Sequence, residues 1–191
     1  DAKFWTRLFC PKNIIRMVKE FKDKNEWALI IGGSSGLGLA TAKKLASHGM
    51  NICIVHRNSR SQQTEIEKEF KKITKKGIDF ISYNTDAFHP EKRAALLEDL
   101  GKELKVGSIK TLVHSVAKGN LKPMISETAP TLQTDDFQLT IQAMGVSLYD
   151  WTKAIFEAKL FSCDARVVSF TSEGNTKAWK NYAAVSAAKV T

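Results

Sequence analysis

The stretch Gly32-Gly33-Ser34-Ser35-Gly36-Leu37-Gly38 lies between a short apolar run and a segment with helical periodicity. Glycines placed between a strand and a helix allow a tight turn and let the backbone approach a pyrophosphate closely. The free N–H groups at the start of the helix then face the anion. We therefore interpret this stretch as a phosphate-binding turn. Its candidate cofactor-binding residues are Gly32, Ser34, Ser35, Gly36, Leu37 and Gly38.

The rest of the chain alternates apolar runs with longer helical stretches, which is typical of βαβ units. We expect strands at about 27–31, 51–55, 78–83, 109–114 and 165–171. We expect helices at about 36–48, 61–76, 90–104 and 135–160, and a further helix that starts near Tyr182. The first two strands are apolar without alternation, as when helices cover both faces of a parallel sheet. The sequence thus predicts a doubly wound α/β fold of Rossmann type over residues 27–191.

Residues 1–26 do not follow this alternation. Apolar residues such as Phe4, Trp5, Ile14 and Val18 recur at helical spacing among Lys and Arg, with Pro11 between them. We predict a basic amphipathic extension of two helices broken by the proline. It either contacts a membrane surface or partner, or packs on the domain or a sister subunit, and we favour packing.

Composition narrows the class of protein. With 191 residues, 43% hydrophobic and 26% charged, the chain fits one soluble domain, and no run approaches the roughly 20 apolar residues of a membrane span. No signal peptide is visible, so we expect a cytoplasmic protein. Cys10, Cys53 and Cys163 form no CxxC pair, which predicts neither a disulfide framework nor a metal site.

The net charge of +9 leaves nucleic acid, a membrane surface and a phosphorylated ligand open as partners. The lysines are spread over predicted helix faces without interleaved aromatic residues, so we expect no nucleic-acid partner. The second strand ends at His56 and Arg57, where a protein that prefers NAD usually presents an acidic residue to the ribose. These two residues can hold a 2′-phosphate instead, which predicts NADPH as the cofactor.

Several motifs resemble the short-chain dehydrogenase/reductase family. The glycine turn is similar to the family's TGxxxGxG turn. Asn84-Thr85-Asp86-Ala87 resembles the turn that contacts adenine, which implies cofactor roles for Asp86 and Ala87. His114-Ser115-Val116-Ala117 resembles the corresponding segment of the enoyl-acyl-carrier-protein reductases, and on that match His114 and Ser115 are cofactor-binding candidates.

The final segment carries the catalytic resemblance. The ordinary family motif is Tyr-x3-Lys, but Ser186 stands at the lysine position, and Lys189 comes seven residues after Tyr182. Both spacings return to nearly the same helix face, the second one turn further along. Tyr-x6-Lys is the arrangement of the enoyl reductases, which implies that Tyr182 meets the thioester carbonyl and that Lys189 binds the nicotinamide ribose. Ser172 is a further catalytic candidate that would help position the carbonyl.

The resemblance implies NADPH-dependent reduction of an enoyl thioester carried on acyl carrier protein, in fatty-acid synthesis. A ketoreductase of the same family is one alternative, although Met144 stands where its relay asparagine would be. A non-catalytic NADP-binding sensor or scaffold is another. Relatives pair through their long helices, so we expect a homo-oligomer, a dimer or tetramer. Family members also run on for several tens of residues, so we expect the substrate lid to lie in a C-terminal part absent from this chain.

Overall fold

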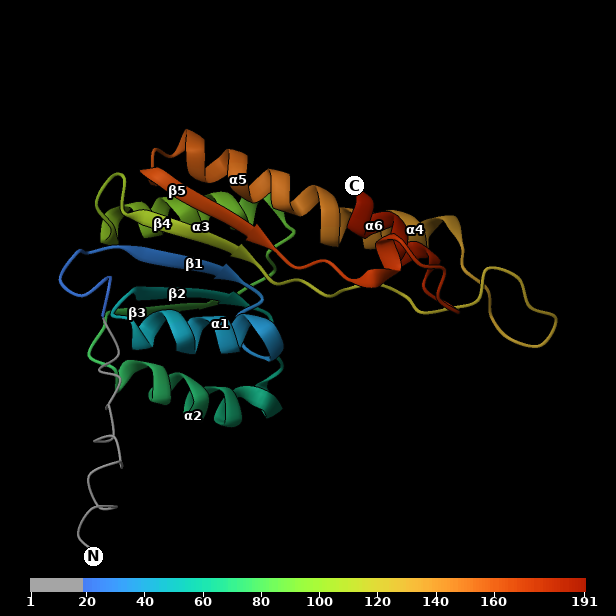
Figure 1. Ribbon diagram of the computed structural model, residues 1–191, viewed down its shortest axis with the longest axis horizontal. Helices are drawn as coiled ribbons and strands as arrows, with labels where there is room; N and C mark the ends of the chain where they lie inside the picture. Colours follow the sequence, from blue (N-terminus) through green and yellow to red (C-terminus); the bar gives the residue numbers. More distant parts are fainter. Residues whose placement is uncertain (1–18) are drawn as a thin grey trace, which may run out of the picture.

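The computed structural model describes residues 19–191 and contains one five-stranded parallel sheet. The strand order is β3-β2-β1-β4-β5, with β1 at the centre (Figure 1). The strands are β1 (Trp27–Ile31), β2 (Asn51–His56), β3 (Phe80–Asn84), β4 (Ile109–His114) and β5 (Phe161–Ser169). The predicted parallel sheet is confirmed.

Helices cover both faces of the sheet. They are α1 (Gly36–Ser47), α2 (Gln63–Thr74), α3 (Pro90–Glu103), α4 (Thr134–Ile141), α5 (Ser147–Glu157) and α6 (Ala183–Val190). In Figure 1, α1 and α2 lie on one side of the sheet, and α3 and α5 lie on the other. The doubly wound arrangement is therefore confirmed.

Each face of the sheet has its own hydrophobic core. On β1, Ala28 and Ile30 pack against α1 and α2, whereas Leu29 and Ile31 pack against α3 and α5. All four side chains are fully buried or nearly so. A central strand that is covered on both faces needs apolar side chains at every position, which explains the absence of alternation in β1.

The predicted single helix over 135–160 is wrong in one respect, because a π-helical turn (Gln142–Val146) separates α4 from α5. A π turn inserts an extra residue into a helix and is frequent at functional sites. The predicted start of the last strand, at residue 165, is also too late, since β5 begins at Phe161. A bulge shifts its register against β4, so that Ile109 faces Phe161 but Thr111 faces Arg166. Polar Ser162 and Asp164 lie in the bulged part. This part of the strand therefore shows no apolar run in the sequence.

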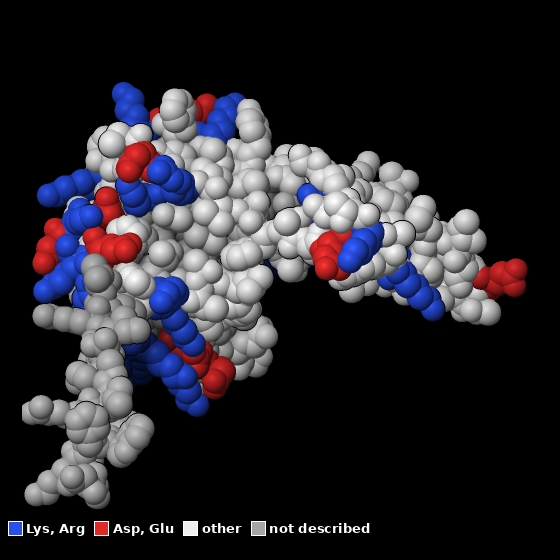
Figure 2. Space-filling model, in the orientation of Figure 1, with Lys and Arg blue, Asp and Glu red and all other residues white. Residues whose placement is uncertain are grey.

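The predicted N-terminal helix pair lies almost wholly outside the described residues. Within 19–191, Phe21 packs against the core beside α1, and its N–H donates to the carbonyl of His48. None of the helices in this range is both long and apolar enough to cross a bilayer. On the face shown in Figure 2, Lys and Arg are mixed with Asp and Glu and lie mainly over the layered sheet.

Candidate active site

A cavity of about 770 Å³ opens at the carboxyl ends of the strands. It lies where β1 is flanked by β2 on one side and β4 on the other, which is the usual ligand position in an open α/β sheet. Most of the candidate site residues line it together: Gly32, Ser34, Ser35, Gly36, Leu37, His56, Arg57, Asp86, Ala87, Ser115, Ser172, Tyr182 and Lys189. Two candidates, Gly38 and His114, lie behind this lining.

The glycine turn brings three backbone segments into direct contact. Gly32 has φ +84°, and a Cβ on it would lie 2.2 Å from the carbonyl oxygen of Ser115. A Cβ on Gly38 would lie 2.4 Å from the carbonyl oxygen of Gly32. Gly38 therefore acts through packing, because any side chain there would separate α1 from the turn. Gly36, at φ +52°, has no neighbour within 4 Å of such a Cβ and faces open space.

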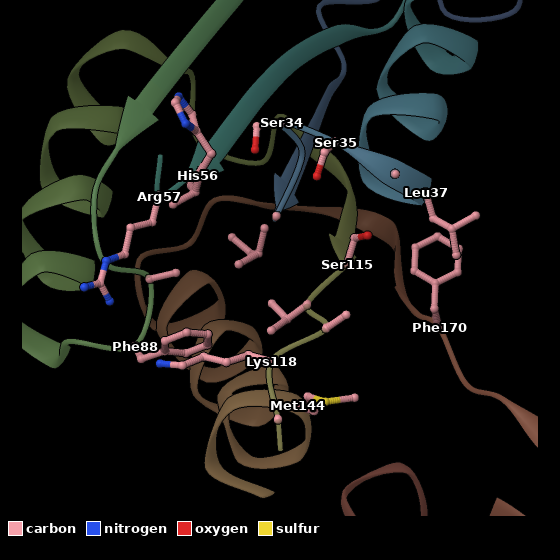
Figure 3. Close-up of a pocket in the computed structure, with 18 of the residues that line it drawn as sticks. Ser34, Ser35, Leu37, His56, Arg57, Phe88, Ser115, Lys118, Met144 and Phe170 are labelled. Carbon is pink, nitrogen blue, oxygen red and sulfur yellow. The ribbon is translucent and has the colours of Figure 1, made fainter. Parts of the chain in front are cut away.

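The first turn of α1 fits an anion. Ser35 is the N-cap residue but its side chain makes no capping hydrogen bond, and the first turn holds no acidic residue. The first N–H groups of the helix therefore have no partner from a side-chain cap. Ser34 and Ser35 lie beside the cavity at this point (Figure 3). These groups fit the pyrophosphate of a dinucleotide.

The ends of β2 and β3 present one cation and one carboxylate to the cavity. Arg57 donates from Nη1 to Oδ2 of Asp86 over 2.9 Å. His56 is only 4% exposed, packs edge-on against Phe70 with ring centroids 5.4 Å apart, and pairs through Nδ1 with Asn58 Oδ1 at 2.9 Å. Burial lowers the pKa of His56. Arg57, rather than neutral His56, therefore supplies the positive charge at this end of the cavity.

Tyr182 and Lys189 reach the cavity from the two ends of α6. Tyr182 is the N-cap residue, and its hydroxyl lies 3.2 Å from Ser172 Oγ. Lys189 Nζ donates to the carbonyl oxygen of Phe170, just after β5, so the lysine ties α6 to the sheet. Burial lowers the pKa of Lys189. The three catalytic candidates are thus neighbours around one cavity wall.

The ring of Tyr182 is held between two residues. A Cβ on buried Gly174 would lie 2.3 Å from Tyr182 Cε1, so only glycine leaves room for the ring. On the other side, Trp179 and Tyr182 have ring centroids 5.3 Å apart. Asn181 precedes the tyrosine with φ +61°, a left-handed conformation that Asn tolerates better than most residues. The backbone conformation and the packing together therefore fix the orientation of the Tyr182 side chain.

His114 is buried behind the cavity and links β4 to the first residue of α5, directly after the π turn. Ser147 Oγ donates to the carbonyl oxygen of Ala143 over 2.8 Å, so it accepts from His114 Nε2 at 2.6 Å. That assignment places the proton of the neutral imidazole on Nε2. Burial and the charge of Lys189 lower the pKa of His114 to about 4. His114 is therefore uncharged near neutral pH.

Lys118 and Phe88 also form part of the cavity wall, although no sequence pattern predicted them there. Lys118 Nζ lies 4.9 Å from the centroid of the Phe88 ring, and Figure 3 shows the two side chains side by side. They come from two different loops, and no periodic pattern brings such residues together. Met144, in the π turn, is also nearly buried and lines the cavity, so the wall is apolar where a relay asparagine would be.

The loop that carries Lys118 is anchored to the start of α4. Asp136 accepts hydrogen bonds from the Gln133 N–H at 2.9 Å, from Lys122 Nζ at 2.9 Å and from the amide of Asn120. These donors lower the pKa of the Asp136 carboxyl, the backbone bond most strongly. The only sequence signal for this anchor is the three-residue spacing of a helix cap, Gln133 to Asp136.

Residues 26–191 match the family profile described as short chain dehydrogenase. A tropinone reductase homolog of Arabidopsis thaliana is 29% identical over 129 residues, covering 64% of this chain and 44% of that protein. A very-long-chain 3-oxoacyl-CoA reductase of Emericella nidulans is 29% identical over 153 residues, covering 75% of this chain and 41% of that protein. The chain therefore spans less than half the length of both relatives.

Among solved structures, an NADPH-bound short chain oxidoreductase of Pseudomonas aeruginosa PAO1, described as containing an atypical catalytic center, superposes with a TM-score of 0.73. It is 19% identical, and the match covers 91% of this chain and 62% of that one. At that identity the likeness shows the fold alone.

Gly174→Ala is expected to destabilise the protein by about 1–3 kcal/mol, because its Cβ overlaps the Tyr182 ring. Gly101→Ala in α3 is the matched control, since its Cβ meets nothing within 4 Å, and we expect it to stabilise by about 0.5–1 kcal/mol. Urea unfolding of both variants measures the difference. Equal effects of the two substitutions would contradict the close fit at Tyr182.

His114→Asn is expected to reduce the amount by which the free energy of unfolding falls between pH 6.5 and pH 4. The folded-state pKa of His114 is lowered from 6.5 to about 4, so its contribution is complete above pH 6.5 and is lost as pH falls toward 4. The loss amounts to about 3 kcal/mol at most. Asn is a polar side chain that does not titrate. Denaturant unfolding at pH 7.5, 6 and 4.5 checks this, and an identical pH slope in both proteins would count against it.

Proposed function

The chain belongs to the short-chain dehydrogenase family, and from this premise we propose that it reduces the conjugated double bond of an enoyl thioester with NADPH. The observation that carries the proposal is the pairing of Tyr182 and Lys189 at seven-residue spacing on one cavity, with apolar Met144 beside them. A ketone reductase needs a polar relay group at that place. An enoyl reductase, by contrast, needs a hydrogen-bond donor to the thioester oxygen and a cation that holds the cofactor.

The cavity has groups for each part of the dinucleotide. The first turn of α1 and the neighbouring Ser34 and Ser35 would hold the pyrophosphate. Arg57 would hold the 2′-phosphate, with Asp86 and Ala87 at the adenine. Ser115 and Lys189 would face the ribose nearer the substrate. The carbonyl of Ala87 accepts from Trp151 Nε1 at 3.0 Å, which fixes the turn that carries these adenine contacts.

When bound, the reduced nicotinamide supplies a hydride to the β-carbon of the substrate. Negative charge would then develop on the thioester oxygen, and the Tyr182 hydroxyl would donate a hydrogen bond to it. A proton from solvent, added at the α-carbon, would complete the reduction. Such a bond contributes most in a site that excludes water. Ser172, 3.2 Å from that hydroxyl, orients it toward the same oxygen. Lys189 adds positive charge nearby and orients the cofactor.

A ketoreductase is the second candidate, and one contact favours it. The Ser172 and Tyr182 hydroxyls lie together as a carbonyl-binding pair, in which the tyrosine would donate a proton to an alkoxide. The names of relatives, among them a 3-oxoacyl-CoA reductase, point the same way. A non-catalytic NADP-binding sensor or scaffold would not need Tyr182 and Lys189 in one cavity.

One macromolecular partner follows from the proposal. The substrate would be carried on acyl carrier protein, in cytoplasmic fatty-acid synthesis, and the net charge of +9 would steer that acidic partner to the enzyme. The proposal includes no nucleic-acid partner. Membrane contact through residues 1–26 is not part of the proposal.

Arg57→Ala is expected to reduce the preference for NADPH over NADH. In the unmodified protein we expect at least about a tenfold preference, which corresponds to about 1.4 kcal/mol. Removing the guanidinium takes away the charge that meets the 2′-phosphate. Fluorescence titration of both nucleotides gives the two dissociation constants, and equal constants in the unmodified protein would exclude the NADPH assignment.

Tyr182→Phe is expected to lower turnover of an enoyl thioester about 100-fold or more while leaving NADPH affinity nearly unchanged, because the hydroxyl acts on charge that appears only in the transition state. Lys189→Ala should lower cofactor affinity and turnover together, since the ribose contacts already exist before reaction. Ser186→Lys should not rescue Lys189→Ala. Full activity in Tyr182→Phe, or unchanged affinity in Lys189→Ala, would show that these roles are misassigned.

A homo-oligomer, dimer or tetramer, is expected to form through α4 and α5 and through α6. Tyr149 and Phe156 are seven residues apart on α5 and both are exposed. Burying such side chains against a second subunit would remove them from water. Light scattering on the full-length protein at micromolar concentration tests this, and a monomer would contradict it.

A further inference from the structure

One ion pair crosses the end of the cavity that would hold the adenosine. Arg57 follows β2 and Asp86 follows β3, and the register pairs His56 with Asn84, so the two strands end side by side. Arg57 Nη1 donates to Asp86 Oδ2 over 2.9 Å. The other carboxylate oxygen, Oδ1, accepts from the N–H of Phe88 at 3.0 Å. The carboxylate is therefore fixed by backbone on one side and holds the guanidinium on the other.

The two partners differ in exposure. The Asp86 side chain is 27% exposed and the Arg57 side chain 68% exposed, so the carboxylate is the anchored partner and the guanidinium is the solvated one. Among the described residues that line this cavity, Asp86 is the sole carboxylate, and the lining also holds the cations Arg57, Lys118 and Lys189. Lys118 is directed onto the ring of Phe88 and not onto Asp86. Lys189 binds the carbonyl of Phe170. Of these three cations, Asp86 therefore pairs with Arg57 alone.

An incoming 2′-phosphate needs the same guanidinium that the carboxylate already holds. A guanidinium has five N–H donors and can bind two anions, but the second anion then meets the negative charge of the first. The phosphate must either displace Asp86 or share Arg57 with it. Both routes reduce the free energy that Arg57 contributes to NADPH binding, and neither affects NADH, which lacks the phosphate.

We propose that Asp86 is a specificity-determining residue that competes with the cofactor's 2′-phosphate for Arg57 and so limits the preference for NADPH. This inference rests on the proposed use of NADPH. Any contact of Asp86 with adenine is common to both nucleotides and cancels in the ratio of their dissociation constants. The ratio therefore isolates the competition for Arg57.

Asp86→Asn is the test, because Asn keeps an oxygen that accepts from Phe88 N–H while it removes the charge that holds Arg57. We expect the ratio of the NADH to the NADPH dissociation constant to rise about three- to fivefold, the range that a partly exposed ion pair allows. In the Arg57→Ala background the same substitution should leave the ratio unchanged. Fluorescence or calorimetric titration measures the ratio without any turnover.

Asp150→Asn is the matched control. Asp150 pairs with Arg93 at 3.5 Å and its side chain is 26% exposed, but it does not line the cavity. Its substitution removes one negative charge and should not move the ratio. A ratio that falls in Arg57→Ala but does not rise in Asp86→Asn overturns the role of Asp86 alone. If the unmodified protein binds NADH and NADPH with equal affinity, and neither substitution changes the ratio of the two dissociation constants, the proposed cofactor preference itself is wrong.

Discussion

The close approach of the glycine turn to the end of β4 is the constraint on which the site depends. The carbonyl oxygen of Ser115 occupies the space that a Cβ on Gly32 would need. The carbonyl oxygen of Gly32 likewise occupies the space that a Cβ on Gly38 would need. These contacts hold the start of α1 against the central strands, so its N–H groups face the same cavity as the ends of β2 and β3. A side chain at either glycine would force the turn and β4 apart.

The cavity wall that carries Tyr182 and Lys189 depends on a second set of contacts, made by α6. Lys189 binds the carbonyl of Phe170 after β5, and Gly174 leaves room for the Tyr182 ring. The π turn beside α6 places Met144 at the cavity, and Ser147, the first residue of α5, bonds both Ala143 of this turn and His114. Because His114 is uncharged, two cations do not lie near each other in one partly buried region, where burial would disfavour both charges.

Sequence patterns predicted the parallel sheet, the glycine turn and the placement of Tyr182 and Lys189 at one cavity, because each depends on local periodicity or on spacing along the chain. They did not predict the π turn, since apolar periodicity continues through residues 142–146. The contact of Lys118 with Phe88 also has no sequence signature, because two loops must first be positioned by the sheet. The burial of His56 against Phe70 depends on how α2 packs, which a strand-end motif does not reveal.

The choice between an enoyl and a ketone substrate rests on Met144 and on the seven-residue spacing, and a direct assay separates the two. The full-length protein is incubated with NADPH and either a crotonyl or an acetoacetyl thioester, and loss of reduced nicotinamide is followed by absorbance. We predict oxidation of NADPH with the crotonyl thioester and little or none with the acetoacetyl thioester. Rapid oxidation with the acetoacetyl thioester alone would contradict the account and establish a ketoreductase.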